Sequence, residues 1–238
     1  MLRLRQIAVV AADRDAVTAR LHDEFGLEVG YHDPEIEQLD LVNAVIPVGD
    51  QFLEVIAPTK DGTTADRFRT RQGGDAGYML IFQTDDHAAH RAAVDEHGVR
   101  IVADFSADGF RNMQLHPADT GGTFVEIDQQ DGQHAWHPAG PDWHAAVRTD
   151  VVRGIAAATV RCHDPEATAR RWGALLLRGP VGGADGSWLI ETDDAIVHLV
   201  PADADEREGI DQVVLAAARP DAAHRVDTTI SGVRFTVG

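Results

Sequence analysis

The chain has 238 residues, 44% of them hydrophobic, which is enough for one large domain or for two domains of ordinary size. Its net charge of −18, from 39 acidic against 21 basic side chains, argues against nucleic acid and against an anionic membrane as partners. The single cysteine, Cys162, excludes an internal disulfide and a multi-cysteine zinc site, and it fits a reducing compartment, so we expect a cytoplasmic protein.

Residues 1–58 predict a strand, a helix and three further strands. Asp13 is placed to cap the helix and Gly26 to end it, and apolar residues recur along one helical face between them. The apolar run near the N-terminus is too short for a signal peptide or a membrane span, so it is interpreted as a strand. The expected strands are Arg3–Val10, Glu28–His32, Leu39–Val48 and Gln51–Ala57.

Residues 76–130 repeat this order after a short helix that Thr64 is expected to cap and that Gly73 and Gly74 are expected to end. The expected elements are a strand at Tyr78–Thr84, a helix from Asp85 or Asp86 to Gly98, and strands at Val99–Val102, Phe110–Leu115 and Thr123–Asp128. The histidines of this helix, His87 and His90, are expected to be exposed. Two modules with the same order of elements form an internal repeat, and the open sheet of each module needs the other module to cover it.

Residues 131–150, which include WHPAGPDWH, are expected to form a linker whose Trp136 and Trp143 cover apolar surface. Residues 151–238 then predict a shortened copy of the first half. Its expected elements are a strand at Ile155–Val160, a helix from Asp164-Pro165, a hairpin of Ser187–Thr192 and Ala195–Val200 around Asp193-Asp194, a strand at Ile210–Ala218, a turn at Pro220-Asp221 and a last strand at Val226–Val237.

Two acidic residues stand at matching places in the repeat. Glu126 lies in the middle of FVEID, and Glu54 lies in the middle of FLEVIAP. Strand alternation places Glu126 on the face of Phe124, so it either reaches solvent at a sheet edge, lines a cavity or is buried with a partner. The second occurrence of the pattern favours a functional position over an edge position.

Four segments between Gln6 and Asp128 resemble the vicinal oxygen chelate superfamily, which includes glyoxalase I, methylmalonyl-CoA epimerase, extradiol dioxygenases and bleomycin-resistance proteins. They are QIAVVAADRDAV, FLEVIAP, RQGGDAGYMLIFQTDDHAAH and HPADTGGTFVEID. The resemblance implies an α+β fold in which paired βαβββ modules form an open, barrel-like cleft. It implies a glyoxalase-like domain at 1–130, with modules 1–58 and 76–130, the linker at 131–150, and a second, shortened and degenerate domain at 151–238.

In metal-dependent members of this superfamily, four strand positions hold one divalent ion. The resemblance places them at Gln6, Glu54, Met79 and Glu126, and implies one Ni²⁺, Zn²⁺, Mn²⁺ or Mg²⁺ ion held by Gln6, Glu54 and Glu126. Met79 departs from the pattern, because the position is usually His and a thioether binds these ions poorly. The corresponding second-half positions carry no ligand set; they are Ala157, His198, Gln212 and Thr236.

As an enzyme, the chain would be a glyoxalase-like lyase or isomerase acting on a small, oxygen-rich metabolite. Glu126 would transfer the proton, with Glu54 and Gln6 contacting the metal or the substrate oxygens. Alternatively, Glu54 and Glu126 would share a proton as a metal-free acid and base. The other function class is a metal-free protein that binds and sequesters a small molecule, as bleomycin-resistance proteins do.

Arg67 and Arg71 form part of a local concentration of positive charge. Together with Met79 they are the expected substrate-binding residues, since guanidinium groups suit a carboxylate or phosphate. The ordinary alternative is solvated helix charge paired with Asp61 and Asp66. A small-molecule ligand is the expected partner, and a homodimer is an open alternative to a monomer.

Overall fold

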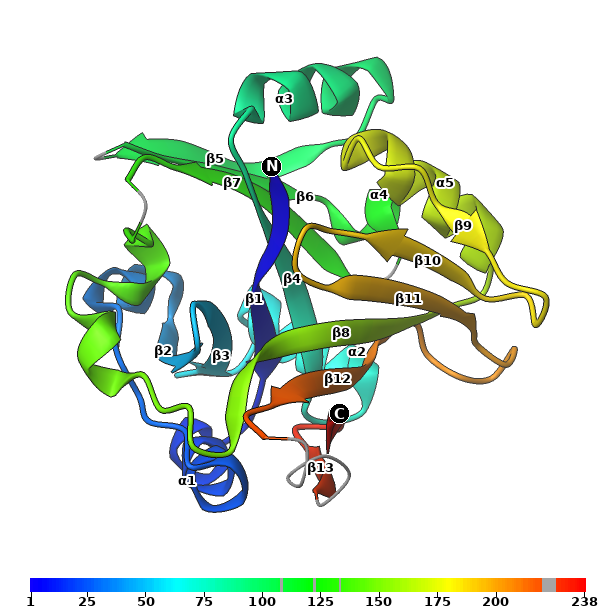
Figure 1. The fold of residues 1–238 in the computed structure, drawn as a ribbon. Coiled ribbons are helices and arrows are strands. Elements are labelled where there is room, and N and C mark those ends of the chain that lie inside the picture. Colours follow the sequence, from blue (N-terminus) through cyan, green and yellow to red (C-terminus); the bar gives the residue numbers. More distant parts are fainter. Residues whose placement is uncertain (108, 122, 133, 220–225) are drawn as a thin grey trace. The chain divides into compact units, whose positions relative to one another are not determined.

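A computed structural model describes residues 1–107, 109–121, 123–132, 134–219 and 226–238, which form an α+β fold with two seven-stranded sheets (Figure 1). The first sheet has the order β2-β3-β1-β4-β7-β6-β5 and the second the order β13-β14-β12-β8-β11-β10-β9. Within these ranges, no helix is long and apolar enough to cross a bilayer.

The strands of the first sheet are β1 (Leu2–Val10), β2 (Leu41–Val48), β3 (Gln51–Pro58), β4 (Ala76–Thr84), β5 (Ile101–Ala107), β6 (Phe110–Leu115) and β7 (Phe124–Gln130). Those of the second are β8 (Val152–Cys162), β9 (Val181–Gly182), β10 (Trp188–Glu191), β11 (Ile196–Pro201), β12 (Gly209–Ala217), β13 (Asp227–Ile230) and β14 (Val233–Val237). The helices are α1 (Arg14–Phe25), α2 (Thr64–Gln72), α3 (His87–Glu96), α4 (Pro117–Thr120) and α5 (Pro165–Leu175), with 3₁₀ turns η1 (Pro34–Leu39), η2 (His137–Ala139) and η3 (Trp143–Ala146).

The chain divides into two compact units, each of which draws on both halves of the sequence. Unit 1 comprises Met1–Arg5, Met79–Ala135 and Ala157–Asp211, and unit 2 comprises Gln6–Tyr78, Trp136–Ala156 and Gln212–Gly238. The expected division into domains at 1–130 and 151–238 stays a prediction.

In unit 2, α1 covers β2 and β3, as its apolar face predicts. Asp13 caps the helix by accepting from the Ala16 N–H, and Gly26 ends it with a φ of 68°. The buried face ends at Phe25, whose ring lies 6.1 Å from that of Phe235 on β14. The predicted helix and both of its end signals are therefore confirmed.

The linker packs onto β3 of unit 2 with its two tryptophans, as predicted. Trp136 stacks on Phe52 with ring centroids 6.3 Å apart, and Trp143 meets the same ring edge-on at 4.9 Å. Both tryptophans are buried. Gln51 is the first residue of β3. Its side chain accepts from the Ile155 N–H and donates to the Ile155 carbonyl, which fixes the start of β8.

In unit 1, α3 packs on β7, and α5 packs on β10 and β11 (Figure 1). The two helices are joined by a 2.9 Å hydrogen bond between His90 Nδ1 and the Leu175 carbonyl. His87 and His90 are both buried, so the expectation that they are exposed is wrong. Burial lowers the pKa of each imidazole, which favours the neutral form of both histidines.

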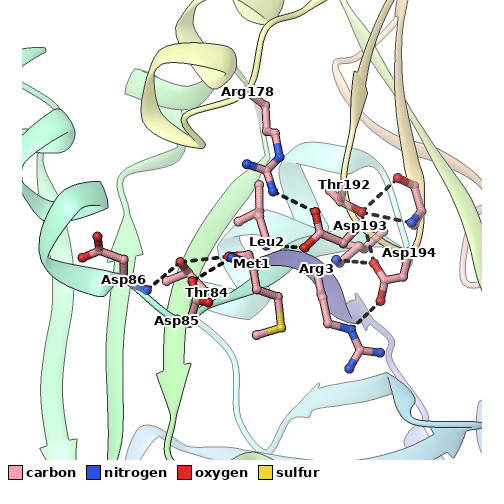
Figure 2. A network of polar contacts seen from close by, with 12 residues as sticks. Met1, Leu2, Arg3, Thr84, Asp85, Asp86, Arg178, Thr192, Asp193 and Asp194 are labelled. Atoms are coloured by element: carbon pink, nitrogen blue, oxygen red, sulfur yellow. Dashed lines mark hydrogen bonds and ion pairs between the residues drawn. The ribbon is translucent and has the colours of Figure 1, made fainter.

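Also in unit 1, the N-terminal residues of the chain are held by the β10–β11 turn (Figure 2). Asp193 accepts from the Leu2 N–H and from Arg178, and Asp194 accepts from the Leu4 N–H and from Arg3 Nε at 2.8 Å. The predicted hairpin around Asp193-Asp194 is confirmed. Its two carboxylates bind a strand almost 200 residues earlier in the sequence.

Asp194→Ala is expected to lower the free energy of unfolding by about 1 kcal/mol, because it leaves the Leu4 N–H and the Arg3 guanidinium without this acceptor. The Asp194 side chain is 21% exposed, so water compensates part of the loss. Urea denaturation of the variant measures the change. Asp205→Ala, at an exposed position of the same unit, is the control and should match the wild type. Equal stability of both variants would contradict a role for Asp194.

Three local predictions are wrong. Glu28–His32 is not a strand, because only Tyr31 forms a bridge, to Val45, before Asp33 caps η1. The strand expected at Val99–Val102 is β5, which begins later and continues to Ala107. The expected last strand is interrupted at Ser231-Gly232, where both φ angles are positive, and therefore forms β13 and β14. The predicted turn at Pro220-Asp221 lies outside the described residues.

Candidate active site

The strand register confirms the internal repeat and the matching of positions within it. In the first copy, Glu54 on the second of two parallel strands pairs with Ala8, which lies two residues after Gln6 on the first strand. The other three copies have the same offset. Their pairs are Glu126 with Ile81, two residues after Met79; His198 with Thr159, two after Ala157; and Thr236 with Val214, two after Gln212. Glu54 and Glu126 therefore occupy equivalent positions in units 2 and 1.

Glu54 is held by two amide groups within unit 2. Asn43 Nδ2 donates to Glu54 Oε1 at 2.7 Å, and Gln6 Nε2 donates to Glu54 Oε2 at 2.9 Å. Asn43 and Gln6 are buried, whereas Glu54 is half-buried. Each carboxylate oxygen thus accepts one N–H and retains a further lone pair.

The orientation of both amides follows from their other partners. The Trp136 indole N–H donates to Gln6 Oε1 at 2.8 Å, and the Asp33 backbone N–H donates to Asn43 Oδ1 at 2.9 Å. Indole and backbone nitrogens donate and do not accept, so the oxygen of each amide must face them. The NH₂ groups of Gln6 and Asn43 consequently point at Glu54.

The pKa of Glu54 is raised above its ordinary value. Burial is the largest cause, and the hydrogen bonds from Asn43 and Gln6 oppose it without cancelling it. A carboxylate whose pKa is raised above its ordinary value while its orientation is fixed is suited to accept and release a proton.

Glu126 has a different setting in unit 1. Gln114 Nε2 donates to Glu126 Oε2 at 3.3 Å and to Met79 Sδ at 3.5 Å. Glu126 and Met79 are both buried. The N···O distance is long for a hydrogen bond from an amide, so the contact of Gln114 with Glu126 is weak.

Unit 1 buries a second acidic side chain on β7, two residues after Glu126. Asp128 pairs with Gln83 in β4 and is fully buried. Neither of its oxygens has a hydrogen bond of good geometry, and the same holds for the side-chain oxygens of Gln83 and Asn112. Burial, followed by the charge of Glu126, raises the pKa of Asp128 well above its ordinary value, which favours the neutral acid.

Sequence reasoning missed several of these polar residues, although alternation gives a signal for one of them. Asp128 lies two residues after Glu126 in a strand and so shares its face. Asn43, Asn112 and Gln114 lie on neighbouring strands, where only the register brings them to the acids.

The expected arginine contacts lie on the surface of unit 2. Arg67 donates to the Gly62 carbonyl and to Thr64 Oγ1, both in its own helix-start segment, and Arg71 is exposed. Their neighbour Arg69 lies near Asp66 and Asp75 rather than Asp61. The substrate-binding role of Arg67, Arg71 and Met79 stays a prediction.

The donors that surround the candidate metal ligands do not fit a divalent ion. For a cation, Gln6 and Glu54 would have to direct oxygen atoms at one point, but Gln6 Oε1 faces the Trp136 indole N–H and Gln6 directs its NH₂ group at Glu54. In unit 1, Glu126 likewise faces an amide donor beside a thioether. No cluster of three or more His, Cys, Asp or Glu suited to a metal occurs in the described ranges.

The structure thus brings Gln6 to Glu54 in unit 2, and Met79 to Gln114 and Glu126 in unit 1. That Glu54 and Glu126 serve one cleft stays a prediction.

Comparisons with known proteins agree with this fold. Residues 6–177 match the family described as glyoxalase-like domain. The ethylmalonyl-CoA/methylmalonyl-CoA epimerase of Cereibacter sphaeroides is 26% identical over 132 residues, which cover 53% of this chain and 97% of the epimerase.

Two solved structures show the fold over most of the chain. A hypothetical protein from Staphylococcus aureus has a TM-score of 0.76 at 12% identity, covering 100% of this chain and 99% of its own. A triple mutant of 4-hydroxymandelate synthase from Streptomyces coelicolor has a TM-score of 0.67 at 14% identity, covering 90% of this chain and 70% of its own. These two structures share the fold, and the family match over residues 6–177 shows that the chain belongs to the glyoxalase-like domain family of the vicinal oxygen chelate superfamily.

Proposed function

We propose that the chain is an isomerase-type enzyme that moves a proton on the carbon next to a carbonyl group of a small metabolite. The observation that carries the proposal is Glu54, a half-buried carboxylate with a raised pKa that two oriented amides hold in place. General acid–base groups need a fixed position and a pKa near the working pH. Two amides fix the position of Glu54, and burial shifts its pKa upward, in the direction that this role requires.

The proposed substrate class is a short acyl thioester of coenzyme A with an acidic hydrogen next to its carbonyl. The supporting observation is the similarity to an epimerase of ethylmalonyl-CoA and methylmalonyl-CoA. Such a hydrogen is acidic because the carbonyl accepts the electron pair that the carbon releases. Arg67 and Arg71 are proposed to attract the negative charges of this substrate.

In the proposed step, Glu54 removes the proton. The C–H bond breaks, an O–H bond forms on Glu54, and the electron pair moves to the carbonyl oxygen as an enolate. Glu126 is the second carboxylate, and we propose that it returns a proton to the carbon and regenerates the carbonyl. Both carboxyl groups then exchange protons with solvent.

Deuterium uptake tests this proposal. Methylmalonyl-CoA and ethylmalonyl-CoA are incubated with the protein in D₂O, and mass spectrometry follows labelling of the carbon next to the carbonyl. We expect labelling faster than in a sample without protein, and slower labelling with Glu126→Gln at unchanged ligand affinity. Ligand binding by calorimetry with labelling at the background rate would instead identify a metal-free binding protein of the bleomycin-resistance type.

A further inference from the structure

Trp136 has a role that its packing alone does not explain. Its ring is 1% exposed and stacks on Phe52 at an interplanar angle of 12°. Its indole N–H donates to Gln6 Oε1 at 2.8 Å across 130 residues of sequence. The linker thus supplies the donor that fixes the orientation of a side chain bound to Glu54.

This hydrogen bond decides which end of Gln6 faces Glu54. Turning the Gln6 amide over would place its NH₂ group against the indole N–H, and its carbonyl oxygen against Glu54 Oε2. Both new contacts join groups of like polarity in a buried place, because Gln6 is 1% exposed. The turned amide is therefore disfavoured by about tenfold or more.

The turned amide is nevertheless the form that a metal ion would require. It would direct one amide oxygen and one carboxylate oxygen to the same point, and these are the oxygen ligands that Mg²⁺ and Mn²⁺ accept. The observed form instead presents an N–H donor to the carboxylate. The orientation of the Gln6 amide therefore decides whether Glu54 is suited to proton transfer or to binding a cation.

We propose that Trp136 is a positioning residue that excludes divalent ions from Glu54 by holding Gln6 in the donor orientation. The proposal deepens the proposed function, on which it rests for the proton-transferring role of Glu54. It concerns metal affinity, which is measured separately from turnover. On this account the linker is part of the site as well as a cover for β3.

Trp136→Phe tests the proposal, because it keeps an aromatic ring beside Phe52 and removes the indole N–H; the loss of ring volume that accompanies this change is shared by the control below. We expect its affinity for Mn²⁺, measured by calorimetry and by electron paramagnetic resonance, to rise at least tenfold over the wild type. Trp143→Phe is the matched control, since Trp143 contacts the same Phe52 ring. Its Mn²⁺ affinity should equal that of the wild type.

Gln6→Glu is a second variant that leaves Trp136 intact. A carboxylate has no N–H to offer Glu54, so one of its oxygens accepts from Trp136 while the other faces Glu54. We expect this variant also to gain Mn²⁺ affinity. The proposal is overturned if folded Trp136→Phe binds Mn²⁺ no better than the wild type, whatever Gln6→Glu does, or if Trp143→Phe gains as much as Trp136→Phe.

The two proposals can fail separately. A wild type without deuterium exchange, combined with Trp136→Phe that gains Mn²⁺ affinity, overturns the enzymatic function and supports the role of Trp136. A wild type that exchanges deuterium, combined with unchanged Mn²⁺ affinity in Trp136→Phe and Gln6→Glu, supports the enzyme and overturns the role of Trp136.

Discussion

Glu54→Gln is expected to slow deuterium exchange by about 10²- to 10⁴-fold, the usual contribution of a general acid–base group. The glutamine side chain has nearly the same shape, but it cannot take the substrate proton. The loss should fall on turnover, because the carbonyl and the coenzyme A moiety are not proposed to contact Glu54. Steady-state kinetics and calorimetric ligand affinity separate the two effects.

Glu37→Gln is the control for this experiment, since Glu37 is an exposed carboxylate in the same unit. Its exchange rate should equal that of the wild type. A Glu54→Gln variant that is folded and exchanges deuterium at the wild-type rate would remove Glu54 from the mechanism.

Asp128→Asn is expected to raise the free energy of unfolding at pH 7 by about 1–2 kcal/mol. The wild-type carboxyl is fully buried without a hydrogen bond of good geometry, beside Glu126. The amide carries no charge, and its NH₂ group can donate to the unpaired oxygens of Gln83 or Asn112. Urea denaturation measures the difference, with Asp142→Asn at an exposed linker position as the control.

The same substitution should alter the pH dependence of stability. The pKa of Asp128 is raised in the folded protein above its ordinary value of 3.8, so the folded state binds more protons than the unfolded state between these two values. The contribution of Asp128 is therefore most favourable below pH 3.8 and is lost as the pH rises through the folded pKa. Asp128→Asn should remove this decline. A variant that is less stable than the wild type at pH 7 would contradict this account.

The repeat and the positions of both site acids could be predicted because they depend on local pattern. Alternation places Glu54 and Glu126 within strands, and Asp13 and Gly26 mark the ends of α1 through contacts a few residues away. Four copies of one strand register then follow from four copies of one sequence pattern. This is the part of the fold that short-range chemistry determines.

The hydrogen-bond partners of those acids could not be predicted in the same way. Asn43 reaches Glu54 from a neighbouring strand, and Trp136 reaches Gln6 from the linker, so both contacts depend on how distant segments pack. The misassigned strand at Glu28–His32 has a similar cause. Its residues have strand propensity, but in the described structure only Tyr31 pairs with a neighbouring strand there, and Pro34 begins a 3₁₀ turn.

The most direct test of the account is deuterium exchange by protein that has been treated with a chelator and shown by elemental analysis to be free of divalent metal. We predict that this protein labels the carbon next to the thioester carbonyl as fast as untreated protein, and that Glu54→Gln slows the labelling by about 10²- to 10⁴-fold. Exchange that disappears with the chelator and returns on addition of Mn²⁺, Ni²⁺ or Zn²⁺ would contradict a proton transfer carried by Glu54 without metal.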